Sequence, residues 1–202
     1  GVHNSKGDTI ENDDLPSEDF YMFLLNVFNN ISYVLKAGGS FYIWHPRAGE
    51  NRMFYNALEE NDLKVRQDLV WVKSRFKLGR QDYQWRHEPC FYGWKGGAGH
   101  YFIDMRSLST VDEYDKLDSM SKEELVTMIR SYLDDVTSVQ HENTPTVDDM
   151  HPTMKPLSLI KRHIRNSSRE GETVLDLFGG SGTTLIACEQ LNRTCCMMEY
   201  DP

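Results

Sequence analysis

Two acidic residues flank a glycine-rich turn near the end of the sequence. Residues 173–184 read TVLDLFGGSGTT, in which Asp176 precedes the glycines, and Glu199 follows one helix and one strand later. Glycines let the backbone pass close beneath a ligand, as in the first turn of a nucleotide-binding strand–turn–helix unit. An acid at the end of the next strand is placed to accept both hydroxyls of a ribose. The pattern therefore predicts a nucleoside site.

The residue types around the turn separate three ligands. A phosphate-binding loop needs a lysine after its last glycine, and none follows Gly182. A dinucleotide site needs a third small residue where this chain has Leu185, and Asp176 would repel a pyrophosphate. S-Adenosylmethionine carries a ribose, a sulfonium and an ammonium group but no phosphate, so two acids suit it. A glycine turn that binds nothing is the remaining alternative.

A basic, aromatic stretch forms a second candidate site. Residues 73–95 carry six Lys or Arg residues against two acids, a local balance of +4. Cations suit phosphates, and aromatic rings can stack on an extruded base, as base-flipping enzymes require. A strand edge with solvated charges and core aromatic rings is the alternative. The candidate nucleic-acid contacts are Arg75, Lys77, Arg80, Tyr83, Trp85, Arg86 and His87.

Helices and strands alternate around these residues. Apolar spacing and breakers predict helices over 17–36, 50–60, 121–136, 157–168 and 183–192, and strands over 40–45, 62–74, 88–95, 173–178 and 193–200. The apolar run 173–178 is typical of a parallel strand that is covered on both faces. This alternation indicates an α/β fold with a mostly parallel sheet.

Composition excludes several other classes of protein. With 39% hydrophobic and 26% charged residues in 202, the chain is typical of a globular domain, and no apolar run approaches a membrane span. Its four cysteines form no C-x-x-C pair and its histidines no zinc spacing, so we expect a reduced, cytoplasmic compartment and no metal. The net charge of −9 argues against a protein coated in nucleic acid but permits a local basic cleft.

Two motifs together resemble the amino-methylating DNA methyltransferases of adenine or cytosine. The residues that match the glycine motif of that family are Asp176, Phe178, Gly179, Gly180, Ser181, Gly182 and Thr183. The residues that match its second cofactor element, upstream, are His151, Pro152, Thr153, Lys155 and Pro156, and Glu199 matches the ribose-binding acid. The resemblance implies that both elements hold S-adenosylmethionine. The alternative is that Pro156 is simply the first residue of a helix.

The motif order resembles the circularly permuted β class. Residues 69–95 resemble later strands of its catalytic half and the loop that lines the target-base pocket, especially in phage and prophage adenine methylases. The resemblance implies a Rossmann-like sheet with helices on both faces. The implied division is a catalytic half over 1–96, a recognition-type insertion over 97–150 and a cofactor half over 151–202. The implied activity is methylation of an exocyclic amine in double-stranded DNA, adenine before cytosine, without a metal or a membrane. Residues 104–149 have a balance of −8, twelve acids against four bases, so a plain insertion or a partner surface is equally open.

One departure from the family concerns its catalytic tetrapeptide, (Asp/Asn/Ser)-Pro-Pro-(Tyr/Phe/Trp). No two of the seven prolines are adjacent, so the tetrapeptide is absent from the 202 residues. In the permuted order it would come directly before Gly1. We therefore expect no catalytic residue in this chain and no methyl transfer from residues 1–202 alone. A non-catalytic nucleoside sensor is the alternative, and the sequence does not indicate whether a restriction nuclease is a partner.

Overall fold

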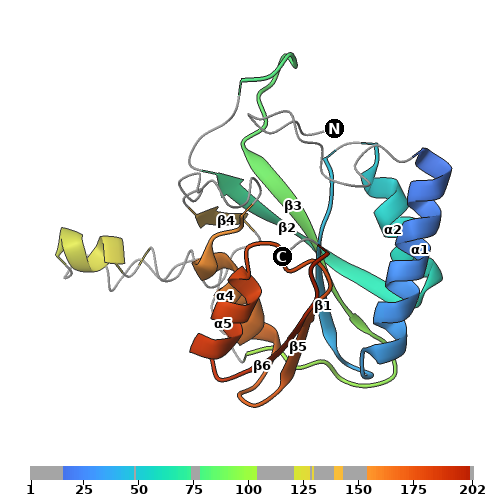
Figure 1. Ribbon diagram of the computed structural model, residues 1–202. Coiled ribbons are helices and arrows are strands. Elements are labelled where there is room, and N and C mark those ends of the chain that lie inside the picture. Colours follow the sequence, from blue (N-terminus) through green and yellow to red (C-terminus); the bar gives the residue numbers. More distant parts are fainter. Residues whose placement is uncertain are drawn as a thin grey trace. The chain divides into compact units, whose positions relative to one another are not determined.

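The computed structural model describes residues 16–47, 49–73, 78–103, 121–127, 129, 139–142 and 154–200. The chain forms two compact units (Figure 1). One comprises residues 1–68, 88–101 and 145–154, and the other comprises 69–87, 102–144 and 155–202. Each unit contains a hydrophobic core of its own.

The first unit packs two helices against strands. Helix α1 (Ser17–Val34) contacts α2 (Asn51–Glu60), and both contribute to a core shared with β1 (Ser40–Trp44) and β3 (His87–Lys95). The buried members of this core are Leu24, Phe28, Phe41, Ala57, Leu58, Leu63 and Phe91. These elements confirm the helices predicted over 17–36 and 50–60 and the strands predicted over 40–45 and 88–95, with ends that differ by one or two residues.

Lys95 ties the end of β3 to the end of α1. Its ammonium donates to the carbonyl oxygens of Ser32 and Leu35, at 2.5 and 3.0 Å. Carbonyls at the end of a helix have no partner within the helix, and a cation there also complements the helix dipole. The lysine thus satisfies the carboxyl end of α1.

A four-stranded sheet has the order β1-β3-β2-β4, in which β2 spans Leu63–Lys73 and β4 spans Val139–Glu142. Strands β2 and β4 are parallel, whereas β1 and β3 are antiparallel, with Tyr42 opposite Tyr92. The α/β class is confirmed, but the prediction of a mostly parallel sheet is wrong here. The described residues between β2 and β3 (78–86) contain no helix that would carry the chain back for a parallel pairing. Strand β4 was not predicted either, because the sequence VQHE lacks a strand-like apolar pattern.

The second unit contains a complete strand–helix–strand unit. Strand β5 (Thr173–Asp176) leads to helix α5 (Thr183–Gln190) and to β6 (Thr194–Met197), which is parallel to β5. Helix α4 (Leu157–Ser167) packs on α5. Ile164, Ala187 and Cys188 form the buried core, against which Val174 and Cys195 pack.

Strand β5 is shorter and less covered than the sequence suggests. Leu175 is 42% exposed, while Val174, its neighbour on the opposite face, packs on the core. The prediction of a strand covered on both faces is therefore wrong, and the strand ends at Asp176 rather than at residue 178. The apolar side chains beyond the strand belong to the turn that follows.

The helix predicted over 121–136 is described over 122–127 and at residue 129. Its predicted capping box is confirmed, because the Ser121 N–H donates to Glu124 Oε2 (3.0 Å) and the Glu124 N–H donates to Ser121 Oγ (3.2 Å). The rest of the predicted helix lies outside the described residues. Among the residues that the structure describes, no helix is long and apolar enough to cross a membrane.

A buried histidine makes the second unit sensitive to acid. His163 on α4 is 5% exposed beside Arg162, which is 6% exposed. Burial of the ring lowers the pKa of His163 from 6.5 to about 3, with a smaller contribution from the charge of Arg162. The unfolded chain therefore binds a proton between pH 6.5 and about 3 that the folded chain does not. This contribution to stability is present above pH 6.5 and is lost as the pH falls toward 3.

We predict that His163→Gln reduces the loss of stability in acid. One proton taken up only by the unfolded chain lowers the free energy of unfolding by about 1.4 kcal/mol per pH unit. Urea unfolding at about pH 7 and about pH 5 should therefore show a loss that is about 2 kcal/mol smaller in the variant than in the wild type. Equal losses in the two proteins would contradict a neutral, buried His163.

Candidate functional site

The glycine turn joins the carboxyl end of β5 to the amino end of α5. The Gly179 N–H donates to the Met198 carbonyl (2.8 Å), and the Gly182 N–H donates to the Gly179 carbonyl (3.0 Å). Asp176, the last residue of β5, accepts a bond from the Phe178 N–H at Oδ1 (3.1 Å). The turn is thus fixed both to itself and to the residue that follows β6.

The three glycines are required for two different reasons. Gly180 has a φ of +51° and Gly182 a φ of +76°, in the left-handed region that side chains rarely adopt. Gly179 does not have a positive φ, but a Cβ built on it would lie 2.4 Å from both Cγ and Sδ of Met197. Backbone conformation therefore selects two of the glycines, and close packing against β6 selects the third.

Glu199 reaches across the turn from the end of β6. Its Oε2 accepts a bond from the Gly180 N–H at 2.5 Å, and its Oε1 accepts one from the Tyr200 N–H at 3.0 Å. An ionised carboxylate has about four acceptor positions, so a carboxylate that accepts from the backbone can also accept from ligand hydroxyls. The bonds also fix the direction of the carboxylate before a ligand binds, which lowers the entropy cost of binding.

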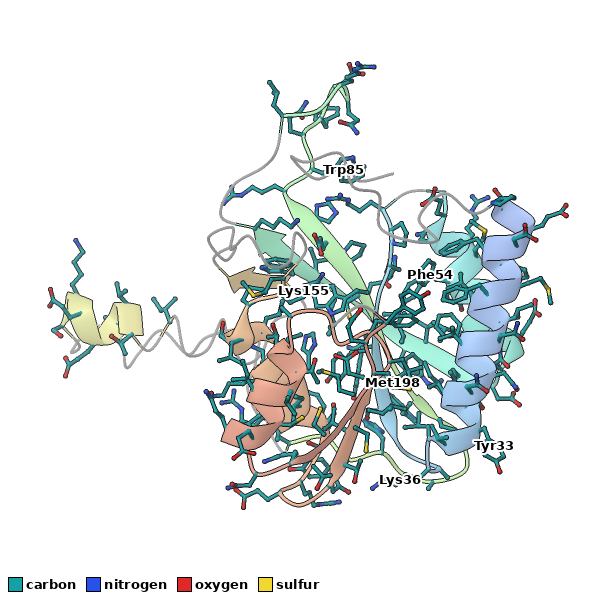
Figure 2. The ribbon with its side chains drawn as sticks, viewed as in Figure 1. Tyr33, Lys36, Phe54, Trp85, Lys155 and Met198 are labelled. Carbon is teal, nitrogen blue, oxygen red and sulfur yellow. The ribbon has the colours of Figure 1, made fainter. Side chains whose placement is uncertain are left out.

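Large apolar side chains are exposed beside the two acids. Phe178 is 64% exposed, Met198 57% and Tyr200 84%, and all three follow the carboxyl ends of β5 or β6 (Figure 2 labels Met198). An aromatic and thioether surface suits a flat heterocycle, while carboxylates suit hydroxyl and ammonium groups. The structure thus brings together Asp176, Phe178, Gly179, Gly180, Ser181, Gly182, Thr183 and Glu199 from the predicted set.

The upstream element is described from residue 154 onward, so Thr153 lies outside the described residues, as do His151 and Pro152. Pro156 immediately precedes the first residue of α4, and its carbonyl accepts a bond from the Ile160 N–H (3.3 Å). The Lys155 ammonium lies 6.0 Å from the centre of the Trp71 ring (Figure 2). A cation at this distance from an indole face is attracted by the ring.

Trp71 was not among the predicted site residues. It is 2% exposed, and the Lys73 ammonium lies 5.3 Å from the centre of the same ring. A tryptophan within a strand is usually a core residue, and Trp71 is buried as such a residue is. The sequence could have indicated a contact with cations only through the position of Trp71 beside the basic stretch. The contact with Lys155 was not predictable, because the two residues are far apart in the sequence.

Within the basic stretch, the segment between β2 and β3 is described over residues 78–86, where it forms a loop, which we call the basic loop. The Lys73 N–H donates to the Arg86 carbonyl (2.8 Å), and Arg86 Nε donates to the Lys73 carbonyl (2.9 Å). The Trp85 ring lies edge-on to the His87 ring, with 5.4 Å between centres. Arg80 and Tyr83 are exposed, and Arg75 and Lys77 lie outside the described residues. The loop is part of the same compact unit as the glycine turn.

The described residues contain no group of three or more His, Cys, Asp or Glu side chains that could hold a metal ion. Asp176 and Glu199, the acids beside the glycine turn, accept hydrogen bonds from backbone N–H groups. The chemistry that these residues support is recognition of a nucleoside that carries positive charge.

The chain belongs to the N6/N4 family of DNA methylases, whose family model matches residues 3–202. It is 25% identical over 204 residues to the type II methyltransferase M.BglII of Bacillus subtilis, covering 91% of this chain and 54% of that protein. The crystal structure of the M1.HpyAVI–SAM complex has a TM-score of 0.66 at 23% identity, covering 92% of this chain and 78% of that one. The cytosine-N4-specific PvuII DNA methyltransferase has a TM-score of 0.65 at 17% identity, covering 96% and 71%.

The chain spans about half the length of the curated relatives that it matches along most of its own length. The resemblance to amino-DNA methyltransferases is thus confirmed at the level of the class. The structural similarities, at 23% and 17% identity, establish a shared fold.

Gly179→Ala and Gly182→Ala should both reduce stability, but only the first loss should be restored by a second substitution at Met197. We predict that Gly179→Ala lowers the free energy of unfolding by about 1–3 kcal/mol through crowding, and that adding Met197→Ala removes most of this loss. Gly182→Ala should cost about 1–2 kcal/mol, because its φ is left-handed, and Met197→Ala should not restore it. Chemical denaturation of the four variants tests both. Equal rescue, or none, would contradict the packing role of Gly179.

Proposed function

We propose that the protein uses S-adenosylmethionine to methylate the exocyclic amino group of adenine in double-stranded DNA. The observation that carries this proposal is the carboxylate of Glu199, held across the glycine turn by the Gly180 N–H, in a chain of the DNA methylase family. The structurally similar M1.HpyAVI was crystallised as a complex with SAM, which supports the same cofactor.

Charge favours S-adenosylmethionine over a dinucleotide or a nucleoside phosphate. Asp176 lies at the end of β5 directly before the turn, and Glu199 lies at its other side. Two carboxylates disfavour a pyrophosphate but attract a sulfonium and an ammonium group. In this assignment Glu199 accepts from the ribose hydroxyls, and the exposed ring of Phe178 borders the adenine.

When bound, the cofactor supplies an electrophilic methyl group. The chain's residues hold the nucleoside end and orient it, and orientation accounts for much of the rate in a transfer of this kind. Acceptors for the hydrogens of the target amine are also needed, and the 202 residues contain no Asp-Pro-Pro-Tyr or similar tetrapeptide. We therefore propose that residues of the whole protein outside this chain supply them, in the permuted order of the β class.

Adenine is preferred over cytosine because the stretch around the basic loop resembles adenine methylases. The fold itself accommodates either base, since the similar PvuII enzyme is cytosine-N4-specific. In this proposal residues 97–150 form the recognition-type insertion, and the basic loop binds phosphates of duplex DNA. Most of that insertion lies outside the described residues.

The cofactor assignment predicts a loss of affinity in Glu199→Ala. Removing charge-assisted bonds to the ribose should cost about 1.5–3 kcal/mol, or roughly 10- to 100-fold in affinity for S-adenosylhomocysteine. Glu189→Ala, at an exposed acid on α5 of the same unit, is the matched control and should bind normally. Titration calorimetry with S-adenosylhomocysteine and with NAD measures both. Tighter binding of NAD, or equal affinity in the two variants, would reject the assignment.

The proposal for catalysis predicts that residues 1–202 alone are inactive and that an amino-terminally extended protein is active. Residues 1–202 alone should bind cofactor yet transfer methyl groups at a background rate, because binding alone stabilises no transition state. Extending the amino terminus with the parent protein's own residues should restore transfer of a tritiated methyl group to DNA. Single strands that carry only adenine or only cytosine as the acceptor base distinguish the two targets.

Two results would overturn this proposal. Robust transfer by residues 1–202 alone would place the catalytic groups within this chain. An extended protein that binds both cofactor and DNA but stays inactive would instead favour a nucleoside sensor.

A further inference from the structure

Two large apolar side chains are exposed on residues 78–83 of the basic loop, a segment that we call the tip. Leu78 is 85% exposed and Tyr83 is 91% exposed. The described part of the loop, residues 78–86, projects beyond the end of β2 (Figure 1). Single exposed apolar residues are common on protein surfaces, so exposure alone assigns them no role. Their setting is what distinguishes these two.

The tip is braced by the side chain of Gln84. Its Oε1 accepts a bond from the Gly79 N–H, and its Nε2 donates to the Gln81 carbonyl, each at 2.6 Å. At the base, two bonds between Lys73 and Arg86 close the loop. The loop therefore holds an apolar tip away from the protein with its own hydrogen bonds, rather than burying it.

The described part of the loop carries two cations and one acid. Arg80 is exposed between Leu78 and Tyr83 in the sequence, and Arg86 follows at the base, against the single acid Asp82. The stretch 73–95 as a whole has a balance of +4 in a chain of net charge −9. An apolar tip flanked by cations complements a polyanion that has an apolar interior, and stacked duplex DNA is such a partner.

The other aromatic residues of the loop occupy a different place. Trp85 lies at the base, edge-on to His87, and is 38% exposed (Figure 2). Trp85 and His87 are therefore placed nearer the sheet, whereas Tyr83 and Leu78 point into solvent. The predicted set of DNA contacts thus divides into a base and a tip, and Leu78 was not in that set.

We propose that Leu78 and Tyr83 form a wedge that enters the base stack of duplex DNA and helps to open it. This inference rests on the proposed function, because a wedge serves an enzyme that must extract its target base. The two side chains occupy the space between bases while Arg80 and Arg86 hold the flanking phosphates. Proteins use apolar wedges in this way, and opening the stack is easiest at a mismatch.

The test measures binding of the full 202-residue chain to two labelled duplexes that differ only by one central mismatch. The wild type should bind the mismatched duplex about 5- to 30-fold more tightly. The double variant Leu78→Ala/Tyr83→Ala should bind both duplexes with equal affinity, and its salt dependence should match that of the wild type, because no charge is removed. A 2-aminopurine beside the mismatch should brighten with the wild type and not with the variant.

Two controls separate the wedge from the charges. Tyr33→Ala removes a tyrosine that is 88% exposed on α1 and should retain the mismatch preference (Figure 2). Arg80→Glu should weaken binding to both duplexes alike and reduce the log–log salt slope by about 0.9 per lost phosphate contact, while keeping the preference. Because Leu78 and Tyr83 are exposed, thermal unfolding of the double variant should match that of the wild type.

The outcomes distinguish the wedge from the proposed function. If the chain binds neither duplex, both the proposed binding of DNA and the proposed wedge are contradicted. A chain that binds DNA without a mismatch preference, or whose double variant keeps that preference, would overturn the wedge alone and leave the proposed function standing.

Discussion

The bond between the Glu199 carboxylate and the Gly180 N–H is the interaction on which the proposed nucleoside site depends. Pairing of β5 with β6 places Asp176 opposite Met197, so that Glu199 emerges two residues beyond the last pair. The turn presents the Gly180 N–H to this carboxylate, and the left-handed φ of Gly180 forms part of the conformation of the turn. Bonds to ionised acceptors are stronger than bonds between neutral groups, so the acid and the turn position each other.

Within one compact unit, the acidic and the basic residues of the two candidate sites lie on different segments of the chain. The acids lie at the glycine turn, and the cations lie on the loop that connects β2 to β3. Carboxylates at the turn disfavour phosphates there, whereas in the proposed function Arg80 and Arg86 of the loop bind them. A protein of net charge −9 can in this way bind a polyanion through one segment, because the local pattern of charge governs the contact.

The loop depends on the antiparallel character of the sheet around β3. Because the described residues between β2 and β3 (78–86) contain no crossover helix, the connection is free to project, and the two bonds between Lys73 and Arg86 close its base. A parallel connection would have placed a helix over the face of the sheet at this point. The departure from the expected parallel sheet is therefore what makes a projecting, basic loop available.

The sequence by itself determined the α/β class, the glycine turn and its acids, and the family, because these depend on local residue types at fixed spacing. The helix 17–36 was predictable for the same reason, since its apolar period is local. Only the tertiary structure decided the antiparallel pairing of β1 with β3, the exposure of Leu175 and the contact of Lys155 with Trp71. Each of these joins residues distant in the sequence or depends on which face of an element is covered. Local spacing carries no information about that, because coverage is set by the packing of other elements.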